Sequence, residues 1–166
     1  MSFLSSMKRR RNDMYYLAYG SNLNAVQMKR RCPGAEMVGT TKIPDHELVF
    51  RRGYLTIEPK EGSYVPAGIW KITPTDEAAL DRYEGFPRFY GKKEIPVTFT
   101  RFRYDGRQYE ETKKCLVYVM QHGIPIEEPS SAYIRTVNQG YADFGFDAEE
   151  WEMLFMAHMR SKEAQK

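Results

Sequence analysis

The chain has 166 residues, of which 42% are hydrophobic and 28% charged, a balance that excludes collagen-like repeats and long-range disorder. No run approaches the roughly 18 apolar residues that a membrane helix needs, and two cysteines are too few for a disulfide framework, so we expect no membrane partner and a cytoplasmic location. The net charge is +3, but residues 1–12 carry four basic and no acidic residues. The rest of the chain is therefore close to neutral, and we expect no nucleic-acid partner for it.

Residues 1–12 are expected to lie outside the folded part of the chain. Their larger apolar side chains, Phe3, Leu4 and Met7, are too few to offset an ordering cost of roughly 1–2 kcal/mol per residue. A secretory signal would place its basic residues before the apolar ones, and here the order is reversed. We therefore predict a disordered tail or an expression remnant, with a nuclear or nucleic-acid address as the alternative, and a single domain over residues 13–166.

The first elements of this domain are a strand, a loop and a helix. The apolar and aromatic run at residues 14–19 predicts a buried strand that ends at Gly20. Asn24 and Gln27 have the spacing of a capping box, which predicts a helix that stops at the Cys-Pro-Gly sequence of residues 32–34. A Gly-Ser-Asn loop therefore joins the strand to the helix.

The middle of the chain predicts strands followed by one helix. Glycine-containing turns separate three strand-like stretches, at residues 46–50, 54–57 and 65–72. A helix follows over residues 73–84, with proline at its first helical position, and Gly85 stops it.

The last part of the chain predicts a hairpin and two helices. Residues 95–104 alternate between apolar and polar side chains, and Asp105-Gly106 is a hairpin turn signal before a return strand. Ser130 or Ser131 caps one helix, and a capping box that begins at Asp147 predicts a second. Strands joined mostly as hairpins, with about four helices at separate points, predict an α+β fold with a curved or closed antiparallel sheet rather than a doubly wound one.

Several common chemistries find no support in this sequence. The three histidines are isolated and neither cysteine lies in a C-x-x-C motif, so we expect no metal site. Cys32 precedes Pro-Gly at a helix end and Cys115 lies in a predicted strand, and we interpret both as structural residues rather than nucleophiles. Ser21 is outside any G-x-S-x-G sequence, which argues against a serine hydrolase.

The loop at Gly20-Ser21-Asn22 is a candidate anion-binding site. It follows a buried strand and precedes a helix, so its backbone N–H groups lack helical partners and lie where the helix dipole is positive. Gly20 would let the chain approach a ligand closely. The alternative is a plain turn between a strand and a helix.

Glu84 is a candidate general base because it ends the predicted helix just before Gly85. The last carbonyls of a helix disfavour a negative charge by roughly 0.3–1 kcal/mol, and aromatic neighbours could shield the carboxyl group from water. Both effects raise the pKa of a carboxyl group. The alternative is a solvated glutamate at a helix end. The aromatic neighbours are Tyr83, Phe86, Phe89 and Tyr90.

Three segments together resemble one enzyme family. They are Tyr16-Leu-Ala-Tyr-Gly-Ser-Asn-Leu23, Arg31-Cys-Pro-Gly-Ala35, and Leu80-Asp-Arg-Tyr-Glu-Gly-Phe-Pro87 followed by Tyr90. Over about residues 14–145 the chain resembles the γ-glutamylcyclotransferase family, which includes the plant AIG2-like proteins. The resemblance implies a small mixed or antiparallel β-barrel flanked by helices, with a pocket over the Gly-Ser-Asn loop.

The resemblance also implies a reaction and residue roles. In it, the α-amine of a small-molecule γ-glutamyl substrate attacks its own γ-carbonyl, so that 5-oxoproline forms and an amine or amino acid leaves. No cofactor is implied, because the nucleophile and the electrophile share one molecule. The implied catalytic residue is Glu84, and the implied substrate-binding residues are Tyr16, Leu17, Ala18, Tyr19, Gly20, Ser21, Asn22 and Tyr133.

Two readings from other classes stay open. One is a non-catalytic barrel that binds a small amino-acid-like ligand or a protein partner. The other is a nucleic-acid-binding domain, which rests on the basic tail alone. Within the enzyme class, the leaving group is open among an amino acid, a lysine side chain, a dipeptide and an antibiotic amine, and the oligomeric state is open as well.

Overall fold

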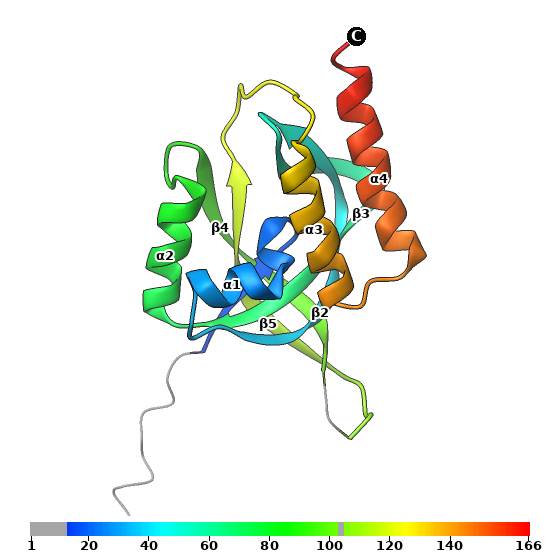
Figure 1. Cartoon of the computed structure of the whole chain (residues 1–166). Coiled ribbons are helices and arrows are strands. Elements are labelled where there is room, and N and C mark those ends of the chain that lie inside the picture. Colours follow the sequence, from blue (N-terminus) through cyan, green and yellow to red (C-terminus); the bar gives the residue numbers. More distant parts are fainter. Residues whose placement is uncertain (1–12, 103–104) are drawn as a thin grey trace, which may run out of the picture.

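In the computed structural model, which describes residues 13–102 and 105–166, these residues form five strands that close into a barrel with helices on its outside (Figure 1). The strands are β1 (Met14–Ala18), β2 (Glu36–Arg51), β3 (Tyr54–Ile72), β4 (Tyr90–Arg101) and β5 (Tyr109–Met120). Their order around the barrel is β1-β3-β2-β4-β5, in which β1 and β5 are parallel and the other neighbours antiparallel. The predicted α+β fold with a small mixed barrel is confirmed. The predicted tail at residues 1–12 and the end of the strand predicted at 95–104 lie outside the described residues.

The helical elements begin and end close to the residues that the sequence indicates. They are η2 (Ser21–Leu23), α1 (Ala25–Arg31), α2 (Pro74–Glu84), α3 (Ser131–Asp143) and α4 (Ala148–Glu163). The start of α2 has a complete capping box between Thr73 and Asp76, and the helix ends at Gly85 with a left-handed φ of 62°. Within the described ranges, none of these helices has the length and apolar character to cross a membrane.

Only half of the capping box predicted for α1 forms. The Asn24 side chain accepts a hydrogen bond from the Gln27 N–H at 3.0 Å, as predicted. The Gln27 side chain instead donates to the Thr136 hydroxyl at 3.3 Å, on the helix α3 that packs beside it. A tertiary contact therefore replaces the second, local hydrogen bond.

β2 and β3 form one long hairpin that is more extended than the sequence predicts. The strands predicted at residues 54–57 and 65–72 are parts of the single strand β3, and β2 begins ten residues before the predicted 46–50. The stretch that joins them, residues 58–64, is mostly polar and contains a glycine, so it has no apolar alternation to signal a strand. Its two ends pair with β2, Glu58 and Pro59 with Glu47 and His46, and Tyr64 with Pro44, while residues 60–63 form an irregularity in the register between these pairs.

The tip of this hairpin is a tight turn that is bonded to the loop after β5. Arg52 and Gly53 have φ angles of 50° and 80°, the pattern of a type I′ hairpin turn. Their N–H groups donate to the carbonyls of Pro125 and Glu127 at 2.9 and 3.2 Å. The turn therefore holds Tyr54, the residue that follows it, in a defined place.

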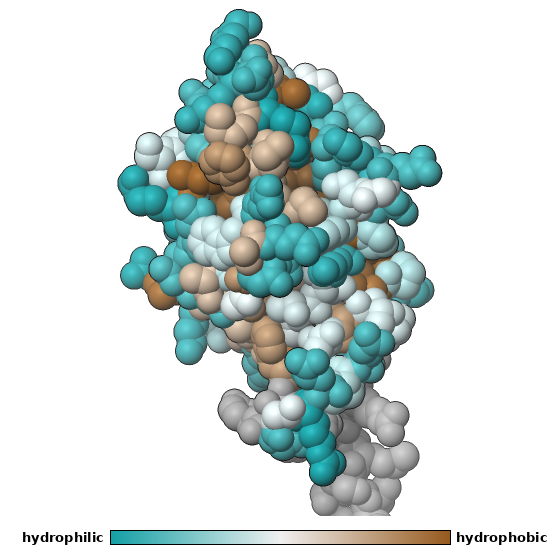
Figure 2. Space-filling view, turned by 90° about the vertical axis from the view of Figure 1, so that its right-hand side faces the viewer, coloured by the Kyte–Doolittle hydropathy of each residue, from teal (hydrophilic) through white to brown (hydrophobic). Residues whose placement is uncertain are grey.

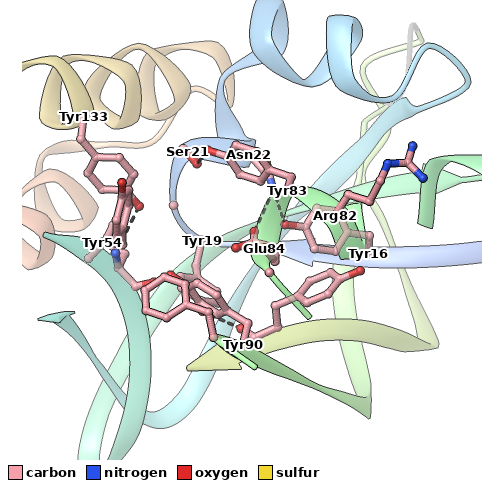
Figure 3. A pocket seen from close by; sticks show the side chains of 15 residues that line it. Tyr16, Tyr19, Ser21, Asn22, Tyr54, Arg82, Tyr83, Glu84, Tyr90 and Tyr133 are labelled. Atoms are coloured by element: carbon pink, nitrogen blue, oxygen red, sulfur yellow. Dashed lines mark hydrogen bonds between the residues drawn. The ribbon is translucent and has the colours of Figure 1, made fainter. Parts of the chain in front are cut away.

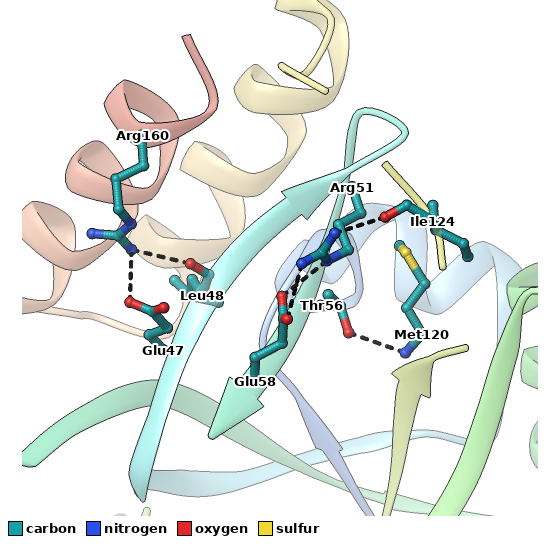
Figure 4. Close-up of polar contacts among 8 residues, drawn as sticks. All are labelled: Glu47, Leu48, Arg51, Thr56, Glu58, Met120, Ile124 and Arg160. Carbon is teal, nitrogen blue, oxygen red and sulfur yellow. Dashed lines mark hydrogen bonds and ion pairs between the residues drawn. The ribbon is translucent and has the colours of Figure 1, made fainter. Parts of the chain in front are cut away.

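Side chains extend this anchoring on both sides of the hairpin (Figure 4). The Arg51 guanidinium bonds both oxygens of Glu58, at 2.9 and 3.0 Å, and the Ile124 carbonyl at 2.7 Å. The Met120 N–H donates to the Thr56 hydroxyl at 3.0 Å, which ties β5 to β3, the two strands that flank β1 in the barrel.

α4 covers the outside of β2 at the C-terminal end of the chain (Figure 1), on the side of the molecule that Figure 2 shows, where apolar side chains lie among hydrophilic ones. Its Arg160 side chain donates to the Leu48 carbonyl at 3.1 Å (Figure 4), and Leu154, on the inner face of α4, is buried. The opposite face of the helix leaves Phe155 and Met156 exposed, at 59% and 45%. α4 is therefore a packed part of the fold with an apolar outer stripe.

Candidate functional site

A cavity of about 330 Å³ opens where β1 turns into η2, between the end of α2 and the start of α3 (Figure 3). Aromatic rings form most of its walls. Its lining residues are Tyr16, Tyr19, Gly20, Ser21, Asn22, Tyr54, Leu55, Arg82, Tyr83, Glu84, Gly85, Phe89, Tyr90, Tyr118 and Tyr133.

The structure brings most of the sequence-predicted site residues together in this pocket. Glu84 and Tyr133 come from opposite parts of the chain and both line it, with the loop from Tyr19 to Asn22 between them. Leu17 and Ala18 do not line it. They lie in β1, paired with β3, and both side chains are fully buried in the hydrophobic core, on opposite faces of the strand.

Glu84 occupies the last position of α2 with its carboxylate turned into the pocket (Figure 3). The Asn22 side-chain amide donates one hydrogen to Glu84 Oε1 at 3.2 Å and the other to the Tyr16 hydroxyl at 2.9 Å. Burial raises the pKa of Glu84 to about 7, while the Arg31 guanidinium acts in the opposite direction. A carboxyl group with this pKa can both accept and release a proton near neutral pH.

The surroundings of Glu84 differ in one respect from the sequence-based expectation. Tyr83, Phe89 and Tyr90 line the pocket, as expected of residues that shield the carboxyl group. Phe86 does not: its ring is 37% exposed, and the Lys92 ammonium lies 4.3 Å from its centre. The left-handed turn at Gly85 directs the chain away from the pocket at this point.

Arg31 was not predicted as a site residue, yet it sets the orientation of Asn22. Its guanidinium donates to Asn22 Oδ1 and lies 3.3 Å from the centre of the Tyr83 ring. Because a guanidinium has no acceptor, the amide oxygen must face Arg31 and the amide nitrogen must face Glu84. The only sequence signal for this residue was its place in the Arg31-Cys-Pro-Gly-Ala35 segment.

The pocket tyrosines Tyr19, Tyr90 and Tyr133 have hydrogen-bonded hydroxyl groups. Tyr19 donates to the Tyr118 carbonyl at 2.5 Å, Tyr90 donates to the Leu55 carbonyl at 2.7 Å, and Tyr133 accepts from the Leu55 N–H at 3.1 Å. Burial raises the pKa of each of these three tyrosines, so all remain neutral phenols. Tyr19 and Tyr90 have therefore already donated their hydroxyl hydrogens, whereas Tyr133 only accepts in its contact with Leu55.

The loop at Gly20 is closely covered by other elements. A methyl group on Gly20 would lie 3.1 Å from the Tyr133 hydroxyl and 3.5 Å from Leu55 Cβ. The N–H groups of Ser21 and Asn22 stand at the start of the 3₁₀ turn, where the helical pattern provides no acceptor. Ser21 Oγ and the Tyr83 hydroxyl are 2.8 Å apart, which ties this loop to the end of α2.

α2 is itself held on the barrel by polar contacts below the pocket. The Tyr118 hydroxyl donates to Asp81 at 2.6 Å, and the Lys92 ammonium lies 3.0 Å from both Asp81 and Glu77. These contacts from β4 and β5 fix the last turn of the helix and therefore place Glu84.

Other reactive side chains lie elsewhere. In the residues that the structure describes, no group of three or more His, Cys, Asp and Glu side chains is placed to hold a metal ion. Both cysteines are free, and burial raises the pKa of Cys32 to about 11 and of Cys115 to about 12, so both are protonated at neutral pH. None of the histidines (His46, His122 and His158) is among the residues that line this pocket.

Comparisons with known proteins point to one family. The chain is 25% identical to the gamma-glutamylcyclotransferase of Bos taurus over an alignment of 150 residues. This alignment covers 84% of the chain and 76% of the bovine protein. A solved structure of a gamma-glutamyl cyclotransferase has 24% identity and a TM-score of 0.68, over 84% of this chain and 85% of that one. YkqA from Bacillus subtilis has 20% identity and a TM-score of 0.64, over 94% of this chain and 56% of that one. The two structural likenesses show the fold.

The match to the family itself covers most of the chain. The model of the family described as "Gamma-glutamyl cyclotransferase, AIG2-like" matches residues 16–141, which include every residue that lines the pocket. It ends before α4, the helix for which the sequence showed no counterpart. The chain belongs to the AIG2-like gamma-glutamyl cyclotransferase family.

Proposed function

We propose that this protein is a γ-glutamylcyclotransferase that converts the γ-glutamyl group of a small γ-glutamyl amine or amino acid into 5-oxoproline and releases the amine. The observation that carries this proposal is Glu84. It is the only carboxylate among the described residues that line the pocket, and its pKa is raised to about 7. An intramolecular aminolysis requires such a group, because the attacking amine is an ammonium ion in free solution.

In the proposed reaction, Glu84 takes one proton from the α-ammonium group of the substrate. The freed nitrogen attacks the γ-carbonyl carbon, a C–N bond forms, and the carbonyl oxygen becomes an oxyanion. The attacking nitrogen then carries two hydrogens and a positive charge. Glu84 returns the first proton to the leaving nitrogen as its bond to that carbon breaks, takes the second proton from the ring nitrogen, and passes it to the released amine, which leaves as an ammonium ion. Atoms and charges balance within one substrate molecule and one carboxyl group.

The remaining groups of the site hold the reactants in place. The backbone N–H groups of Ser21 and Asn22 suit an anion, either the α-carboxylate of the substrate or the developing oxyanion. The Asn22 amide holds Glu84 Oε1 and so limits the directions in which the carboxylate can point. The walls fold the flexible γ-glutamyl chain, which brings its two ends within reach.

The direct test is incubation of the purified protein with a panel of γ-glutamyl amines and γ-glutamyl amino acids. We expect release of 5-oxoproline together with an equal amount of amine from at least one member. Absence of 5-oxoproline from every member would contradict the proposed reaction and favour a barrel that only binds such compounds.

Glu84 should also affect how the stability of the protein depends on pH. Between about pH 4.5 and pH 7 the folded protein holds a proton that an unfolded glutamate has released, so wild-type stability should fall as the pH rises through this interval. Glu84→Gln removes the effect. From about pH 5 to pH 8, the free energy of unfolding of the variant should increase relative to that of wild type, by up to about 3 kcal/mol. We expect its melting temperature to rise relative to that of wild type over the same interval. The exposed Glu152→Gln is the control, and parallel pH curves for all three proteins would contradict the prediction.

Arg31 should set the pH at which activity appears. Since its guanidinium lowers the pKa of Glu84, Arg31→Met should raise that pKa and shift the acidic limb of the kcat/KM profile to higher pH. We expect the loss of kcat/KM in Arg31→Met, relative to wild type, to be at least about threefold larger at low pH than on the alkaline plateau. Arg30→Met, an exposed neighbour on α1, should leave the profile in place. A uniform loss at every pH would mean that Arg31 acts on folding alone.

A further inference from the structure

The pocket has a polar side and an aromatic side. Glu84 and the loop residues Ser21 and Asn22 lie together on one side, and Tyr54 and Tyr133 lie across from them (Figure 3). The Tyr54 ring packs edge-to-face on Tyr133, with centres 5.2 Å apart, and on Phe89, with centres 6.0 Å apart. These three rings, Tyr54, Phe89 and Tyr133, are called the aromatic wall below.

The aromatic wall is held in place before any ligand arrives. Tyr54 follows the type I′ turn at Arg52 and Gly53, whose N–H groups are bonded to the loop after β5. Leu55 is bonded through its N–H to Tyr133 and through its carbonyl to Tyr90. A preorganised surface of this kind loses little entropy when a ligand covers it.

The charges around the aromatic wall discriminate between ligands. The Arg52 guanidinium lies 5.4 Å from the centre of the Phe89 ring, so this ring face already has a cation beside it. The guanidinium of Arg82 points away from the cavity in Figure 3, although the residue contributes to the lining. A cationic ligand would therefore meet repulsion from Arg52, whereas an uncharged apolar group would bury itself against rings.

The zwitterionic end of a γ-glutamyl substrate needs the polar side of the pocket. Its α-ammonium group must reach Glu84, and its α-carboxylate needs donors, which the loop provides. The group attached through the γ-amide must then extend toward the other side. Resting on the proposed function, we infer that the aromatic wall is the leaving-group subsite and selects γ-glutamyl conjugates of amino acids with uncharged, apolar side chains, aromatic ones above all.

The test compares the conjugates γ-glutamyl-phenylalanine and γ-glutamyl-alanine, which differ by one ring. We expect wild-type kcat/KM to favour the phenylalanine compound by at least about tenfold, and Nε-(γ-glutamyl)lysine, with its free charges, to be the poorer substrate by a similar factor. Tyr54→Ala should bring the phenylalanine-to-alanine ratio within about threefold. Phe155→Ala, which removes an exposed ring from α4, should leave the ratio unchanged.

Thermal melts accompany these assays, and Tyr54→Gln provides a second variant that lacks the ring but keeps a side chain of similar length. Turnover of both conjugates within threefold of each other by wild type would overturn the subsite while the proposed function stands. A preference that survives in both Tyr54 variants would also overturn it, because the ring would then bind elsewhere. Absence of 5-oxoproline from all three compounds and from the wider panel would contradict the proposed function, and the subsite with it.

Discussion

Replacement of Glu84 with glutamine should slow release of 5-oxoproline by about 10²–10⁴-fold and leave the protein folded. Glutamine has nearly the same shape and can keep the contact with Asn22, but it cannot accept the ammonium proton of the substrate. The loss corresponds to about 3–5 kcal/mol of activation free energy. The measurement is a product assay, with ligand binding and a thermal melt on the same preparation.

The outcome separates a proton carrier from a solvated glutamate at a helix end. A solvated residue would change stability by less than about 0.5 kcal/mol on this substitution and would leave turnover intact. Glu152→Gln on α4 serves as the control for loss of one carboxylate. Turnover by Glu84→Gln within about threefold of wild type would refute the mechanism.

Replacement of Gly20 with alanine should lower kcat/KM for γ-glutamyl substrates by at least about tenfold. The melting temperature of the variant should stay within a few degrees of that of wild type. The added methyl group would lie 3.1 Å from the Tyr133 hydroxyl, so either Tyr133 or the loop must shift. Such a shift would move the N–H groups of Ser21 and Asn22 away from the anion that we expect them to bind. The measurement is steady-state kinetics together with a thermal melt.

Gly91→Ala is a matched control, because its methyl group would lie 3.2 Å from the end of the flexible Gln121 side chain and at an ordinary contact distance of 3.7 Å from the Val119 carbonyl oxygen. It should leave kcat/KM close to the wild-type value. A substrate that lacks the α-carboxylate supplies an independent check, since it removes the anion rather than the loop. Equal turnover with and without that carboxylate would contradict binding of the substrate α-carboxylate by Gly20–Asn22.

The sequence by itself determined where most helices begin and end, because those signals act over a few residues. Asn24, Thr73 and Ser130 each accept a hydrogen bond from a backbone N–H within three residues, and Gly85 adopts the left-handed conformation that ends α2. The same locality explains the missed part of β3. Residues 58–64 are polar and turn-like in sequence, and pairing with β2 on both sides of the register shift, at Glu58, Pro59 and Tyr64, is what continues the strand through them.

The candidate site was predictable to a smaller extent. The Gly-Ser-Asn loop and Glu84 stand out as short segments, and the resemblance joined them across more than sixty residues of chain. Leu17 and Ala18 belong to the same segment, but in β1 their side chains are buried by the packing on the two faces of the strand and do not reach the pocket.

Only the tertiary structure decided which distant side chains surround Glu84. Arg31, Tyr54 and Tyr118 reach the site from α1, β3 and β5, and no local signal ties any of them to α2. It also decided the main cause of the raised pKa of Glu84. The sequence pointed to the helix end as well as to shielding, whereas burial beneath rings from several elements dominates, because desolvation depends on everything packed around the carboxyl group.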